Sequence, residues 1–146
     1  MREPCEYQVG YREVRGPSQE WFVAAYLGLV PASGEQVLQR MRVQLAIRNA
    51  KQPIGLPTAG SVFRNPPGDH AARLIESCGL KGDAVGSAAV SEKHANFIVN
   101  RGGALSADVE ALMERVAATV HDRRGVRLTP EVHVVGTRTS EWVSPS

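Results

Sequence analysis

The chain has 146 residues, of which 42% are hydrophobic and 22% charged, an ordinary balance for one globular domain. A net charge of +2 is too small to indicate nucleic acid, and no apolar run approaches the roughly 18 residues that a membrane span needs. Cys5 and Cys78 match no disulfide, zinc or redox spacing, and the polar N-terminus is no secretory signal, so we expect a cytoplasmic protein without a metal site.

The first half of the chain alternates between irregular and periodic segments. Residues 1–20 are rich in proline and glycine and are expected to be irregular, whereas the apolar run 21–30 predicts a buried strand. Apolar residues repeat at helical spacing over 33–48, which begins with a capping-box pair. Residues 49–68 hold four prolines and three glycines. They therefore predict a long loop of a kind that is often functional.

The second half predicts alternating helices and strands. A short helix is expected over 69–79, two strands at 84–90 and 95–100, and the longest helix over 106–125. Residues 126–136 predict either a final strand pair or one strand broken at a proline. Because the strands are few and some connections are too short for crossovers, we expect an α+β fold. Its sheet is small and mainly antiparallel, with helices packed on one face.

The stretch AGSVFRNPP, residues 59–67, groups a hydroxyl, a guanidinium and an amide on a loop that prolines stiffen. Arg64 and Asn65 suit a phosphate group, since one offers a planar charged fork and the other uncharged donors. Ser61 has two interpretations: a turn residue bonded to the backbone, or part of a cradle for an anion. Lys51 adds charge before the loop, although most such cations are simply solvated.

Two further positions carry ionisable groups next to predicted strands. His94 precedes the strand at 95–100, where a hydrogen-bonded edge residue is a commoner role than a ligand or a base. Glu131 follows a proline and opens an apolar segment. It is either a capping carboxylate or a buried acid directed into a cleft, and both alternatives stay open.

Three segments, in order and at matching spacing, resemble the C-terminal part of the UDP-N-acetylenolpyruvoylglucosamine reductase family: LPTAGSVFRNPPGDHAARLIESCGLKG, GSAAVSEKHANFIVN and LTPEVHVVG. Upstream, GYREV and FVAAYLGLVP resemble the end of the family's FAD-binding region. The resemblance implies that residues 1–31 are the end of that region, 32–136 a substrate-binding domain and 137–146 a flexible tail. It also implies that most of the FAD-binding domain is missing.

The family's reaction, implied by this resemblance, uses NADPH to reduce FAD, which passes hydride to UDP-N-acetylglucosamine enolpyruvate and yields UDP-N-acetylmuramate. By the same resemblance, Ser61 donates the proton and Glu131 assists at the developing enolate. The residues that would hold the substrate are Asn65, Lys51, His94 and Tyr11.

Two hypotheses follow for the chain by itself. It is either the substrate-binding and proton-donating part of the reductase, inactive alone and without retained FAD, or a non-catalytic paralogue that binds a UDP-sugar or a protein partner. A general nucleic-acid-binding domain has little support, because the charge is small and only 5% of the residues are aromatic.

Overall fold

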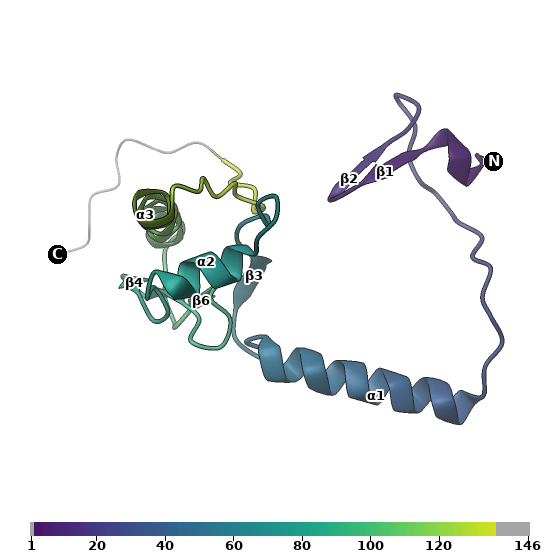
Figure 1. The fold of residues 1–146 in the computed structure, drawn as a ribbon, viewed down its shortest axis with the longest axis horizontal. Helices are drawn as coiled ribbons and strands as arrows, with labels where there is room; N and C mark the ends of the chain where they lie inside the picture. Colours follow the sequence, from purple (N-terminus) through teal and green to yellow (C-terminus); the bar gives the residue numbers. More distant parts are fainter. Residues whose placement is uncertain (1, 137–146) are drawn as a thin grey trace. The chain divides into compact units, whose positions relative to one another are not determined.

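The computed structural model describes residues 2–136 (Figure 1). The chain divides into two units, Met1–Val37 and Leu38–Ser146, each with its own internal contacts. The expected tail at 137–146 lies outside the described residues. The expected domain boundary after residue 31 stays a prediction.

The first unit contains a short 3-10 helix, η1 (Pro4–Glu6), and a hairpin of β1 (Gln8–Gly10) and β2 (Glu13–Arg15). A two-residue connection joins the strands, and in it Arg12 has a left-handed φ of 60°. This hairpin corrects the expectation of an irregular segment over 1–20. Tight antiparallel pairing needs only a few residues of each strand, too few for a periodic signal in the sequence.

The predicted buried strand over 21–30 is wrong. The segment forms neither helix nor strand, and its large side chains are exposed, with Trp21 at 91% and Val23 at 94%. An apolar run forms a buried strand only where a sheet edge pairs with its backbone and other residues cover its side chains. Within residues 2–136, no strand pairs with this segment.

Helix α1 (Gly34–Lys51) confirms the predicted helix, and the N–H of Gln36 donates to Ser33 Oγ at 3.3 Å at its start. The helix has no buried residue. The side chains of its expected apolar face are 41% to 54% exposed: Val37, Leu38, Met41 and Leu45. Periodicity therefore identifies the helix correctly, although the described residues do not bury its apolar face.

The second unit is built on an antiparallel sheet with the order β3-β6-β5-β4. Its strands are β3 (Thr58–Ser61), β4 (Ala84–Val85), β5 (Ala88–Val90) and β6 (Phe97–Asn100). Strand β3 corrects the expectation of a continuous loop over 49–68, because pairing with β6 makes a strand of a segment that contains Ala59 and Gly60, residue types depleted in strands. Instead of the single strand predicted over 84–90, β4 and β5 form a hairpin, since Gly86 adopts a left-handed φ of 53°.

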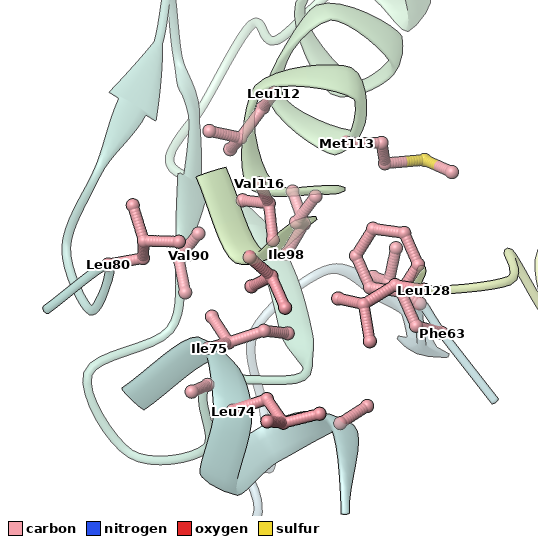
Figure 2. Packing of buried hydrophobic residues seen from close by; sticks show 14 of the residues in the cluster. Phe63, Leu74, Ile75, Leu80, Val90, Ile98, Leu112, Met113, Val116 and Leu128 are labelled. Atoms are coloured by element: carbon pink, nitrogen blue, oxygen red, sulfur yellow. The ribbon is translucent and has the colours of Figure 1, made fainter. Parts of the chain in front are cut away.

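Helices α2 (Ala71–Ser77) and α3 (Ser106–Arg124) share one hydrophobic core with the sheet and confirm the predicted α+β fold. Figure 2 shows Ile98 of β6 between Val116 of α3 and Ile75 of α2. Burying each such side chain contributes about 1.5–3 kcal/mol. The neighbours of Ile98 in the strand, Phe97 and Val99, are buried but do not belong to this core cluster. They lie on the other face of the sheet, which α2 and α3 do not cover.

We expect amide hydrogen exchange to be faster over residues 5–30 than over α3. Segment 21–30 has exposed side chains and no strand partner among the described residues, whereas α3 buries Leu112, Val116 and Val120. Exchange followed by NMR or mass spectrometry tests this, with α2 as an internal reference in the core. Protection of 5–30 equal to that of α3 would contradict the prediction.

Candidate functional site

Ser61 lies at the end of β3, half-buried and opposite Phe97 of β6. The register shifts between Thr58 and Ser61, and Gly60 there has a left-handed φ of 86°, which favours glycine. Residues opposite one another in an antiparallel pair place their side chains on the same face of the sheet. Ser61 therefore lies with Phe97 on the face that the helices leave open.

The backbone after Ser61 is held from two sides. On one side, the N–H of Val62 donates to the carbonyl oxygen of Asn96 at 2.9 Å. On the other side, the N–H of Glu131 donates to the carbonyl oxygen of Val62 at 2.8 Å, and that of Arg64 to Thr129 at 2.9 Å. These bonds bring Glu131 beside the residue that follows Ser61.

The strands predicted over 126–136 do not form within the described residues. This segment is joined to the backbone after Ser61 only by the bonds at residues 129 and 131 and an isolated bridge between Phe63 and Pro130. A proline has no N–H to donate, so the ladder cannot continue through it. Glu131 itself is half-buried and its Oε2 atom is buried, and both alternatives for this residue stay predictions.

Asn96 is a functional candidate that the sequence reasoning missed. It is only 4% exposed, its Oδ1 accepts from the N–H of Phe63 at 3.0 Å, and its Nδ2 donates to the Phe63 carbonyl oxygen at 2.8 Å. A signal for it was present: an amide within the apolar run ANFIVN needs hydrogen-bond partners when its neighbours are buried. The identity of those partners is not visible in the sequence.

Asn65 has a structural role at the start of α2. Its Oδ1 accepts from the N–H of Ala71 at 3.0 Å, and this bond satisfies a donor of the first helical turn. Asp69, two residues before the helix, is bonded to Arg73 and to the N–H of His70, and these bonds hold its pKa at about 2. The assignment of Asn65 to the substrate stays a prediction, for which its NH2 group is the relevant donor.

His94 packs against the same part of the sheet. Its ring contacts the ring of Phe97 edge-on at a centroid distance of 4.7 Å, and its Nδ1 accepts from the N–H of Asn96 at 3.3 Å. Burial lowers the pKa of His94 below its ordinary value, because the charged form loses hydration. Since Phe97 lies opposite Ser61, the structure brings these two predicted site residues to one region.

A cavity of about 310 Å³ adjoins this region. Its lining includes the apolar Ile54, Leu56 and Val99 and the polar or charged Ser91, Glu92, Lys93 and Arg101. Lys93 Nζ donates to the carbonyl oxygen of Asn49 at 2.5 Å and so links the cavity to the end of α1. Lys51, the last residue of α1, is exposed and lies two positions before Pro53, another lining residue. The sequence reasoning singled out neither Lys93 nor Arg101 for this role, although both flank β6.

Tyr11 belongs to the first unit, in the connection between β1 and β2, where it is 64% exposed. Its role toward the substrate stays a prediction. Among residues 2–136, no helix is long and apolar enough to cross a membrane. The same residues contain no group of three or more His, Cys, Asp or Glu side chains that could hold a metal ion.

Residues 52–135, more than half of the chain, match the family model described as UDP-N-acetylenolpyruvoylglucosamine reductase, C-terminal domain. The chain belongs to the UDP-N-acetylenolpyruvoylglucosamine reductase family. Reductases of this name from Alkalilimnicola ehrlichii and Nitrosococcus oceani are 59% and 58% identical to it over 135 residues. The match covers 92% of this chain and 45% of each relative, so the chain spans a little under half of their length.

The crystal structure of a reductase of this family from Thermus caldophilus matches 86% of this chain and 45% of its own, with a TM-score of 0.71 and 38% identity. The resemblance stated from the sequence and the fold class are therefore confirmed. The roles of individual site residues stay predictions, now with positions in the fold.

Acid should destabilise the second unit through His94. Burial lowers its pKa in the folded chain from a value of 6.5, so the unfolded chain binds more protons at this site. The stabilising contribution of the neutral imidazole is complete above pH 6.5 and is lost as the pH falls toward the folded-state pKa. Thermal unfolding between pH 8 and pH 5 should therefore depend less on pH in His94→Gln than in the unsubstituted chain.

The matched control is His121→Gln, at an exposed position on α3. It should keep the pH dependence of the unsubstituted chain. An identical effect of both substitutions would show that His94 is not the group responsible.

Proposed function

We propose that this chain is the substrate-binding and proton-donating part of an NADPH- and FAD-dependent reductase of peptidoglycan precursor synthesis in the cytoplasm. Its substrate is UDP-N-acetylglucosamine enolpyruvate, and its product is UDP-N-acetylmuramate. The observation that carries the proposal is the hydrogen bond from the N–H of Glu131 to the carbonyl oxygen of Val62, at 2.8 Å. It joins Val62 and Glu131, two residues 69 positions apart, and Val62 is next to Ser61, in a chain of this family.

Reduction of the enolpyruvyl double bond adds a hydride to the β-carbon and a proton to the α-carbon. Hydride addition leaves negative charge on the α-carbon and its carboxylate, so the site must hold an enolate-like species and deliver one proton. In the proposal, the Ser61 Oγ–H bond breaks and the proton bonds to the α-carbon. Glu131, when protonated, donates a hydrogen bond to the enolate, whereas an ionised carboxylate would repel it.

A serine hydroxyl is a weak acid, so its conjugate base needs nearby donors or cations, and its position must be maintained. The bonds on both sides of Val62 supply the second requirement. A fixed proton donor does not have to be ordered when the substrate binds, which removes an entropic cost from the reaction.

The cavity beside β6 supports the assignment of the UDP moiety to this chain. Two cations, Lys93 and Arg101, and one carboxylate, Glu92, line it, a net positive charge that favours an anion such as a diphosphate. Ile54, Leu56 and Val99 offer an apolar wall to a base. Asn65, Lys51 and His94 remain the family-implied ligands of this moiety. The volume of about 310 Å³ suits part of the substrate rather than all of it.

The described residues do not fit FAD by themselves. Two open cavities among these residues, of about 310 and 290 Å³, are near the lower limit for a small ligand, and a flavin dinucleotide is larger than such a ligand. We therefore assign FAD and NADPH to the part of the relatives that this chain does not span. The exposed apolar side chains of 21–30 and α1 are surfaces that such a domain would cover.

Substrate binding can be measured by calorimetry on this chain with UDP-N-acetylglucosamine enolpyruvate. We expect Asn65→Asp to weaken binding about 10-fold, because a carboxylate replaces the NH2 donor next to an anionic substrate. Aspartate keeps an oxygen that can accept from the N–H of Ala71, so an unchanged thermal midpoint is the control for folding. Equal affinities would contradict the role of Asn65.

Catalysis can be measured in a full-length chimera in which the uncovered N-terminal part of the Alkalilimnicola ehrlichii reductase precedes this chain. We expect Ser61→Ala to lower kcat for substrate-dependent NADPH oxidation by about 10²–10⁴-fold, since it removes the proton donor. Ser77→Ala, at an exposed serine of α2, is the control. A chimera that binds substrate but loses no activity in Ser61→Ala would exclude the proton-donor role.

A further inference from the structure

The side chain of Asn96 occupies a place in the sheet that backbone groups usually fill. Strand β6 begins at Phe97, which pairs with Ser61, and the chain turns away just before it, where the N–H of Phe97 donates to the carbonyl oxygen of His94 at 3.0 Å. The carbonyl oxygen of Asn96 still accepts from Val62. At the next residue, Phe63, the side-chain amide of Asn96 makes the bonds: it donates to the Phe63 carbonyl oxygen and accepts from the Phe63 N–H.

Three hydrogen bonds with Asn96 thus hold Val62 and Phe63, the two residues that follow Ser61. The paired N–H and carbonyl contacts with Phe63 reproduce the exchange of bonds between opposed residues of an antiparallel ladder. They fix the orientation of the Phe63 backbone, because a single side-chain amide can satisfy both groups in only one arrangement.

We propose that Asn96 is a positioning residue for Ser61, an inference that rests on the proposed function, in which Ser61 is the proton donor. The carbonyl oxygen of Asn96 binds the N–H of Val62, and the carbonyl oxygen of Val62 in turn accepts the N–H of Glu131, so the backbone that Asn96 holds lies between both proposed catalytic residues. Burial of the Phe63 side chain, which is 2% exposed, holds that residue in the core. It does not fix the direction of its peptide groups, which is the part that Asn96 supplies.

Asn96→Asp in the full-length chimera separates positioning from substrate binding. Aspartate preserves the shape and the acceptor for the Phe63 N–H, but its carboxylate cannot donate to the Phe63 carbonyl oxygen and repels it. We expect kcat to fall about 100-fold, the scale of a displacement of about 1 Å at a reacting group, while KM for the UDP-sugar changes less than about 2-fold.

Asn100→Asp is the matched control. Asn100 ends the same strand, and the bonds from its side chain are acceptor bonds, to the N–H groups of Gly102 and Ala104. Aspartate can make the same bonds, so kcat and KM should stay within about 2-fold of the unsubstituted values. An equal loss in both variants would show that a new charge at either end of β6 is harmful and would overturn the inference.

The double variant Ser61→Ala, Asn96→Asp tests whether Asn96 acts through Ser61. If it does, the second substitution lowers kcat no further once the hydroxyl is gone; independent effects would multiply and would overturn the inference. Full activity in Ser61→Ala would remove the proton-donor assignment itself. A loss in Ser61→Ala with none in Asn96→Asp would remove the positioning role alone.

Hydrogen exchange on the unsubstituted chain gives an independent test should Asn96→Asp fail to fold. The Phe63 amide should exchange as slowly as the amides of β6, since Asn96 Oδ1 accepts its proton. Exchange at the rate of the exposed loop residues would show that the bond does not persist, and the inference would fail.

Discussion

The short backbone segment from Val62 to Arg64 is the constraint on which the candidate site depends. It accepts and donates hydrogen bonds toward β6 on one side and toward residues 129–131 on the other. Neither side offers a continuous strand: the chain turns away just before β6 begins at Phe97, and Pro130 interrupts the last segment. Isolated backbone bonds and one side-chain amide therefore hold this segment in place of a continuous β-ladder. That arrangement leaves Ser61 on a strand end while its surroundings are fixed.

The asymmetry of the sheet explains why the site lies where it does. Ile98 faces the helices and belongs to the core, whereas Phe97 and Val99 face the other way. The face without α2 and α3 carries Ser61, the ring contact of His94 with Phe97, and the wall of the cavity formed by Val99. Hydrophobic burial on one face thus supplies stability, and the opposite face is left for polar groups and a ligand.

Periodic segments of the sequence were predictable, and features that depend on distant contacts were not. The helices at α1, α2 and α3 and the strand at β6 follow from apolar spacing. Strand β3 has no such signal, since its residues pair only because β6 lies beside them. Segment 21–30 has the apolar character of a strand but no partner among the described residues, so its pattern predicts a structure that does not form.

The candidate site likewise has features that the local sequence indicates and features that depend on distant contacts. Local chemistry left Ser61 and Glu131 with ordinary alternatives, and the resemblance to the reductase family gave them roles. Their closeness in space depends on two backbone bonds across the sheet edge, which no local pattern encodes. Asn96 was visible only as a polar residue in an apolar run, and its partner, the backbone of Phe63, is 33 positions away.

The need for this rigidity follows from the division of labour in the proposed reaction. Hydride and proton must reach adjacent carbons of one double bond, and the proposal places their donors in different parts of a longer protein. The relative position of two such groups is reliable only if each is rigid within its own part, because any local motion adds to the motion between the parts. A hydroxyl on a freely moving loop would lose this advantage. The amide of Asn96 and the N–H of Glu131 remove that freedom close to the hydroxyl, where a small displacement has the largest effect on the reacting geometry.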